Sequence, residues 1–137
     1  MPHAKFPVEI LTPEGEVFNE EVEMVSTRTT VGVIGILANH SPLLATLEPT
    51  ELKLYRSDTE ILRFAQAEGY LQVADNRAML LVQEAVSPES LDVADLRTRL
   101  GEAEATLAAS DAGSEKYRQA AREQKRLTAF IAVAESA

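Results

Sequence analysis

The chain has 137 residues, of which 45% are hydrophobic, carries a formal net charge of −9 and contains no cysteine. This length and composition fit one folded domain with a small appendage, and they exclude intrinsic disorder, a disulfide framework and thiol chemistry. Residues 1–87 carry −7 of the net charge and residues 88–137 carry −2. Because the front part repels phosphate backbones, nucleic-acid binding is not expected.

Residues 1–87 have the pattern of short strands separated by turns. The first expected turn is Thr12-Pro13-Glu14-Gly15, where proline and glycine stand at positions that a tight turn favours. A strand over 22–28 would place Val22, Met24 and Ser26 on one face. The expected strands are 6–11, 16–18, 22–28, 51–55, 60–64, 70–73 and 77–83. Many short strands with regularly spaced turns predict an all-β sandwich or barrel.

An apolar run with two glycines occupies residues 32–44, between the third and fourth of these strands. Gly32 and Gly35 permit backbone bends that a side chain would forbid, and Pro42 restricts the residue before it to extended conformations. No Gly-Lys-Ser/Thr follows the glycines, so the run does not match a phosphate-binding loop. We expect it to form a docking loop that presents small, mostly uncharged groups to a partner.

From Pro88 onward the apolar residues recur at helical spacing, and the segment 110–114 interrupts them. Asp92 is expected to cap the first helix. The two apolar stripes are Val93, Leu96, Leu100, Ala103 and Leu107, and then Tyr117, Ala120, Gln124, Leu127, Ile131 and Ala134. They predict an antiparallel helical hairpin. Because its seam is rich in alanine and includes Gln124, the hairpin is expected to pack on a further surface, either the β domain or another protein.

The predicted fold class is therefore α+β. An antiparallel β-sandwich or barrel over residues 1–87 precedes a two-helix hairpin over residues 88–137.

The sequence contains no arrangement typical of catalysis or metal binding. It has no nucleophile motif such as Gly-x-Ser-x-Gly and no pair of residues at metal-ligand spacing. His40 is the only histidine in the part expected to fold, and it is expected to hydrogen-bond backbone groups in the bend at 39–42. Glu20, Glu21 and Glu23 are expected to form a solvated surface, with Glu21 and Glu23 on one face of a strand.

The second expected helix carries a basic flank. Arg118, Arg122 and Lys125 or Arg126 follow the i, i+4 and i+7/i+8 spacing that places them on one helix face. Three interpretations remain open for this face: simple solvation, contact with an acidic protein surface, or contact with a nucleotide phosphate.

Several motifs, taken in order, resemble those of a known family. They are Gly-x-x-Gly-Ile-Leu-x-Asn-His-Ser-Pro-Leu-Leu at 32–44, Leu47-Glu48-Pro49, the segment Glu68-Gly69-Tyr70-Leu71-Gln72-Val73-Ala74-Asp75-Asn76, and Leu80-Leu81-Val82-Gln83-Glu84-Ala85 leading to Leu91-Asp92. Over its whole length the chain resembles the ε subunit of the F-type ATP synthase. The fold that this resemblance implies, a β-sandwich followed by a helical hairpin, agrees with the fold predicted from the residue pattern.

The resemblance implies a non-catalytic subunit of the central rotor stalk, bound to the γ subunit and to the ring of c subunits. Proton-driven rotation of the ring would pass through this subunit to γ. The subunit would lie at the cytoplasmic face of the bacterial cell membrane, associated with the membrane only through the complex. The residues implied to meet the c-ring are Gly32, Val33, Ile34, Gly35, Leu37, Asn39, His40 and Pro42.

The resemblance also implies a regulatory role for the hairpin. In many family members it leaves the sandwich, extends along γ and inhibits ATP hydrolysis, which would bring it to the α and β subunits. The regulatory basic face would then be Arg118, Arg122, Lys125 and Arg126.

Nucleotide-binding members of the family read Ile/Leu-Asp-x-x-Arg-Ala at the first helix, where this chain has Leu91-Asp92-Val93-Ala94-Asp95-Leu96. Because Asp95 would repel phosphate, no cofactor is expected; the candidates for a regulatory ATP contact are Asp92, Arg122 and Arg126. Two other functions remain open, a stand-alone nucleotide-sensing module and a small β-domain enzyme that uses His40.

Overall fold

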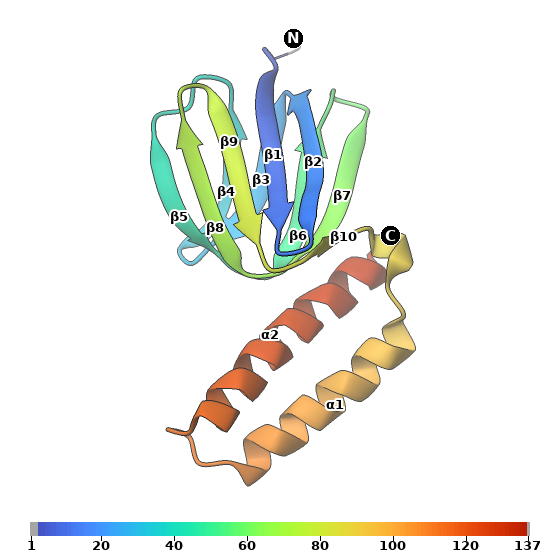
Figure 1. Ribbon diagram of the computed structural model, residues 1–137. Coiled ribbons are helices and arrows are strands. Elements are labelled where there is room, and N and C mark those ends of the chain that lie inside the picture. The colour runs from blue at the N-terminus through green and yellow to red at the C-terminus, as the bar shows by residue number, and fades with distance from the viewer. Residues whose placement is uncertain (1–2, 137) are drawn as a thin grey trace.

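The computed structural model describes residues 3–136 as a β-sandwich with a two-helix hairpin beneath it (Figure 1). The strands are β1 (Phe6–Thr12), β2 (Gly15–Val22), β3 (Met24–Thr29), β4 (Gly32–Leu37), β5 (Leu43–Leu47), β6 (Thr50–Tyr55), β7 (Ile61–Gln66), β8 (Gly69–Ala74), β9 (Arg77–Val82) and β10 (Ala85–Val86). A short 3₁₀ helix, η1 (Pro88–Ser90), leads to α1 (Val93–Ala109) and α2 (Glu115–Glu135). The predicted fold class is therefore confirmed.

The strands are hydrogen-bonded in the order β10-β7-β6-β3-β5-β8-β9-β1-β2, and β4 pairs with β3 outside this path. All pairs are antiparallel except β1 with β9, which is parallel. Alternate residues of these strands point inward and pack into one apolar core that includes Phe6, Ile10, Val25, Leu54 and Leu80. The sandwich therefore has an outer face on β5, β8, β9 and β1 that the hairpin does not cover (Figure 1).

The expected strand over 22–28 is interrupted at Glu23, where β2 ends and β3 begins. The backbone N–H of Glu23 donates to the carbonyl of Tyr55 at 2.7 Å, and its side chain is buried. The prediction that Glu23 lies on a solvated surface is therefore wrong. The interruption also shifts the alternation by one residue, so β3 buries Val25 and Thr27 and leaves Met24 only partly covered.

Both predicted helices form, and side chains cap their N-termini. The carboxylate of Asp92 accepts from the N–H of Asp95 at 3.2 Å, and the hydroxyl of Ser114 accepts from the N–H of Tyr117 at 3.1 Å. Neither helix within residues 3–136 is long and apolar enough to cross a membrane.

The hairpin packs on the sandwich through α2, as one of the two alternatives from the sequence anticipated. Ala65 and Ala67 of the sandwich form a second core with Leu96 of α1 and with the α2 residues Leu127, Phe130, Ile131 and Val133. The predicted α2 stripe contained Leu127 and Ile131 but missed Phe130 and Val133. Those two residues belong to a second apolar face, which packs on the sheet rather than only on α1.

Candidate docking surfaces and hairpin contacts

The run 32–44 is not one docking loop. Its first half is β4, which pairs with β3 along its whole length, and its last residues begin β5. Of its two glycines, only Gly32 has a positive φ, at 134°, whereas Gly35 lies in ordinary strand conformation and faces the sulfur of Met24. The alternation that defines β4 is present in the sequence, because Ile34 and Ile36 point inward between outward-facing neighbours.

The β3–β4 turn presents an apolar tip, formed by Val31 and Val33, whose exposed fractions are 96% and 67%. The hydroxyl of Thr29 holds this turn, since it donates to the carbonyl of Gly32 at 3.0 Å and accepts from the N–H of Val31 at 3.2 Å. The N–H of Thr30 donates to Thr46 in β5 at 3.1 Å. The tip is therefore an exposed apolar feature on a fixed turn.

The bend at residues 39–42 lies at the other end of β4, about 20 Å from the tip at the usual rise of a strand. Asn39 has a φ of 62°, and its N–H donates to Asn76 Oδ1 in the β8–β9 turn at 2.6 Å. His40 Nδ1 lies 2.7 Å from the carbonyl oxygen of Ser41. The expected role of His40 in organising this bend is confirmed, and the predicted c-ring residues divide between two distant sites.

A second exposed apolar surface, which sequence reasoning missed, lies on the sandwich. We call Leu11, Leu44, Tyr70, Met79 and Leu81 the outer apolar face. Tyr70 of β8 pairs with Leu81 of β9, and Leu81 pairs with Leu11 of β1. The exposed fractions of Leu44, Tyr70 and Leu81 are 74%, 57% and 42%. The sequence signal was the presence of large apolar residues at the outward positions of strands whose inward positions already supply a core.

The predicted basic face of α2 divides into two pairs of residues. Arg118 and Arg122 both pair with Glu115 of the same helix, at 2.9 and 3.3 Å. Lys125 and Arg126 instead reach the sandwich. The Lys125 ammonium lies 2.9 Å from the carboxylate of Glu48, and the Arg126 guanidinium lies 2.6 Å from the carboxylate of Glu84. For Lys125 and Arg126, the interpretation as a contact with an acidic protein surface therefore holds, and that surface belongs to the sandwich of the same chain.

Arg126 is the most enclosed of these cations. It also pairs with Glu123 at 2.7 Å and lies 5.6 Å from the centre of the Phe130 ring. Burial by itself would lower the pKa of Arg126, but the hydrogen bond and charge of Glu123 and the charge of Glu84 raise it above its usual value. The guanidinium is therefore permanently charged and fully engaged.

The C-terminal end of α2 is held by Arg63 of β7. Its guanidinium pairs with Glu51 and donates to Ser136 Oγ at 2.9 Å and to the carbonyl of Val133 at 3.4 Å. It thus satisfies a free carbonyl at the helix end, where a positive charge is also favoured. Burial raises the pKa of Glu51, but Arg63 and Lys53 outweigh burial and hold it below its usual value.

Acidification is expected to loosen the hairpin. The pKa values of Glu51 and Glu123 lie below the ordinary 4.5 in the folded chain, because Arg63 and Arg126 outweigh the effect of burial. The Glu51–Arg63 pair lies within the sandwich and the Glu123–Arg126 pair lies within α2, so each acts on the hairpin by orienting an arginine that reaches across to the other side. This contribution is present in full above pH 4.5 and is lost as the pH falls through the lowered pKa values. Fluorophores on Thr59→Cys and Asp111→Cys should separate as the pH falls from about 7 to about 3.

The matched control is the same labelled chain with Glu51→Gln and Glu123→Gln, whose inter-dye distance should change less over that range. A wild-type distance that does not change with pH would contradict this account of the hairpin contacts.

The three candidates for ATP binding do not converge on one site. Asp92 caps α1, and Arg97 near that end pairs with Glu135 at the far end of α2. Arg122 and Arg126 instead line a cleft of about 770 Å³ between the β1–β2 turn and α2. Five carboxylates also line this cleft: Glu14, Glu16, Glu68, Glu84 and Glu123. A nucleotide triphosphate would meet more negative than positive charge there.

Millimolar ATP is consequently expected to leave the Tm of this chain unchanged, as thermal denaturation would measure. The same Tm measurement, with and without ATP, is made on a comparison variant that carries Asp95→Arg and Leu96→Ala. These two substitutions restore the pattern that nucleotide-binding members of the family have at this helix. A rise in Tm of several degrees for the wild-type chain would show that it binds nucleotide.

Among residues 3–136, no group of three or more His, Asp or Glu side chains is placed to hold a metal ion.

Comparison with known proteins agrees with this architecture. Residues 5–88 match the family model described as ATP synthase, Delta/Epsilon chain, beta-sandwich domain. ATP synthase epsilon chain 2 of Syntrophotalea carbinolica is 36% identical over 75% of this chain and 74% of its own length. The epsilon chain of Persephonella marina is 37% identical over 74% of this chain and 75% of its own length.

Among solved structures, a chain of the Euglena gracilis mitochondrial ATP synthase, in a complex of OSCP, F1 and c-ring, superimposes with a TM-score of 0.82. It is 22% identical, and the match covers 94% of this chain and 81% of that one. At this identity the likeness bears on the fold alone. On the family match and the curated relatives, the chain belongs to the delta/epsilon chain family of ATP synthase, the non-catalytic subunits of that complex.

Proposed function

We propose that this chain is a subunit of the central rotor stalk that connects the γ subunit with the c-ring. The γ subunit would bind on its outer apolar face and the c-ring at its apolar tip. The observation that carries the proposal is the exposure of Leu44, Tyr70 and Leu81 on one face and of Val31 and Val33 on the tip. Large apolar side chains gathered on a folded protein mark surfaces that a partner covers. Family membership supplies the identity of those partners.

The two surfaces support a mechanical rather than a chemical role. Both lie on paired strands or on a hydrogen-bonded turn, so a force applied at the tip passes into a rigid sheet. Rotation of the c-ring, driven by its coupling ion, would therefore turn γ through this subunit. Attachment to γ and the c-ring would place the chain peripherally at the cytoplasmic face of the bacterial cell membrane.

The γ contact is tested with a matched pair of variants. Leu81→Asp and Ile61→Asp introduce the same charge at positions of equal exposure, 42% in each case, but only Leu81 belongs to the outer apolar face. Leu81→Asp is expected to weaken binding to the purified γ subunit by about 100-fold, because a desolvated carboxylate would lie in the interface. Ile61→Asp should bind as the wild type does, as titration calorimetry would show. Equal binding by both variants would refute docking on this face.

We further propose that the hairpin restrains ATP hydrolysis when it leaves the sandwich and extends along γ toward the α and β subunits. Its position here is supported by a small apolar cluster, by two ion pairs, Lys125 with Glu48 and Arg126 with Glu84, and by hydrogen bonds from Arg63 to the end of α2. Ion pairs that are partly exposed contribute little individually. A contact of this kind opens without unfolding the sandwich, whose own core lies apart from it.

A further inference from the structure

Two arginines differ from all the others in residues 3–136. Arg28 and Arg77 form no ion pair, whereas each remaining arginine pairs with a carboxylate of the chain itself. Those pairs involve Arg56, Arg63, Arg97, Arg99, Arg118, Arg122 and Arg126. In a chain with a net charge of −9, acceptors for a guanidinium are plentiful. An arginine without one is therefore available to a carboxylate from outside.

Both unpaired arginines lie beside an exposed apolar surface. Arg28 is the cross-strand partner of Val33 at the apolar tip. Arg77 begins β9, and Met79 and Leu81 follow it on the same side of that strand as parts of the outer apolar face. Both arginines without an ion pair in residues 3–136 thus lie beside surfaces that partners are proposed to cover.

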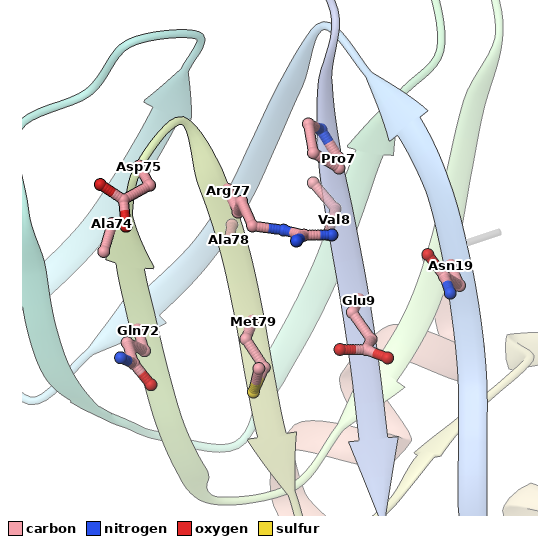
Figure 2. Close-up of a pocket in the computed structure, with 10 residues that line it drawn as sticks. All are labelled: Pro7, Val8, Glu9, Asn19, Gln72, Ala74, Asp75, Arg77, Ala78 and Met79. Atoms are coloured by element: carbon pink, nitrogen blue, oxygen red, sulfur yellow. The ribbon is translucent and has the colours of Figure 1, made fainter.

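Arg77 lies at a hollow of about 270 Å³ in the surface formed by β8, β9, β1 and β2 (Figure 2). Its guanidinium extends from β9 toward β1, where the carboxylate of Glu9 lies farther along the strand (Figure 2). Neither Arg77 nor Glu9 has an ion pair or a side-chain hydrogen bond within residues 3–136, and the amide of Gln72 on β8 has none there either. The hollow is therefore lined by one cation, Arg77, by the carboxylates of Glu9 and Asp75, and by the amides of Gln72 and Asn19. Of these side chains only Asn19 has a hydrogen bond within residues 3–136, which it donates to Glu16.

This set of groups has a definite preference for its partner. A guanidinium presents a planar fork of donors that matches the two oxygens of a carboxylate, and the amide of Gln72 can add a further donor. Glu9 and Asp75 would oppose an incoming acid on its own, and a cation beside that acid would complement them. The complementary surface is thus an acidic side chain adjacent to a basic one.

We propose that Arg77 and Glu9 determine the specificity and orientation of docking on the outer apolar face. Arg77 receives a carboxylate of the γ subunit, and Glu9 receives a neighbouring cation. This inference rests on the proposed function, because it takes γ as the occupant of that face. The apolar residues supply contact area, and the paired charges select the partner and fix how it sits.

The test is Arg77→Glu, with Lys116→Glu as its control. Lys116 is also exposed and without an ion pair, and its reversal changes the net charge identically, but it lies on α2 near the hairpin turn, away from the face. Arg77→Glu is expected to weaken binding to purified γ by about 30-fold or more, whereas Lys116→Glu binds as the wild type does. Both side chains are exposed, so both variants should retain the wild-type Tm.

Charge exchange sharpens the result. Acidic residues of γ are replaced by arginine one at a time, and one such replacement should restore binding to Arg77→Glu while weakening binding to the wild-type chain. If Arg77→Glu binds γ normally while Leu81→Asp does not, the face docks γ but Arg77 carries no specificity, and this inference fails alone. If neither substitution affects binding, the proposed function fails as well.

Discussion

Replacing Phe130 with alanine is expected to release the hairpin from a sandwich that remains folded. Phe130 is almost fully buried, and its ring packs in the second core with Ala65, Ala67 and Leu127 while the Arg126 guanidinium lies over it. Removing a buried phenylalanine ring typically costs about 3–5 kcal/mol, which exceeds what any single one of the partly exposed ion pairs provides. Hydrogen exchange should therefore accelerate in α1 and α2 but not in β1–β9.

Thr128→Ala is the matched control, because Thr128 is the exposed neighbour of that region of α2 and its loss removes no core contact. If the hairpin inhibits when extended, an ATP synthase reconstituted with Phe130→Ala should also hydrolyse ATP more slowly than one with Thr128→Ala. Faster hydrogen exchange throughout the sandwich would instead show that the sandwich core unfolds together with the hairpin core. Unchanged hydrolysis with a released hairpin would refute the inhibitory role.

Replacing Gly69 with alanine is expected to destabilise the sandwich strongly. A Cβ at this position would lie 2.0 Å from the carbonyl oxygen of Leu81 and 2.6 Å from the Cα of Val82, and both of these are backbone atoms that cannot rotate away. The β8–β9 pairing would have to open locally, at a cost of about 3 kcal/mol. For a chain of this size that corresponds to a Tm lower by roughly 10 °C.

Gly101→Ala makes the same chemical change with the opposite expected sign. Gly101 lies within α1, and nothing occupies the position of its missing Cβ. The substitution should stabilise the helix by about 0.5–1 kcal/mol. Thermal denaturation of the two variants tests the cause of the change in Tm. It shows whether stability is lost because the neighbouring backbone is too close for a Cβ, or because any glycine is replaced. A Gly69→Ala chain with the wild-type Tm would contradict the β8–β9 geometry.

Gly69 also bears on function through its neighbour in the chain. Gly69 directly precedes Tyr70, whose ring belongs to the outer apolar face. Local opening of β8 and β9 would therefore disturb the proposed γ surface as well as the core. Loss of γ binding in Gly69→Ala would not by itself identify a contact, whereas Leu81→Asp and Arg77→Glu change exposed side chains and leave the pairing intact.

The sequence by itself determined the helical hairpin, most of the strands and the absence of a catalytic motif. Asp92 caps α1 as predicted, and Leu96 and Leu127 are buried as their spacing requires. These features depend on residues three or four apart in a helix, or two apart in a strand, so a short window of sequence contains all the information needed. His40 could be assigned to its bend for the same reason, since its hydrogen bonds are to nearby backbone.

The tertiary structure alone decided which distant residues meet. The parallel pairing of β1 with β9, the burial of Glu23 and the contacts of Lys125 and Arg126 with the sandwich all join segments far apart in the chain. Arg126 and Glu84 are 42 residues apart, and Arg63 and Ser136 are 73 apart. No local pattern specifies such pairs, because a charged side chain on a helix surface looks the same in sequence whether solvent, its own chain or a partner receives it. Only the folded chain distinguishes Arg126, which is fully engaged, from Arg77, which remains free to bind a partner.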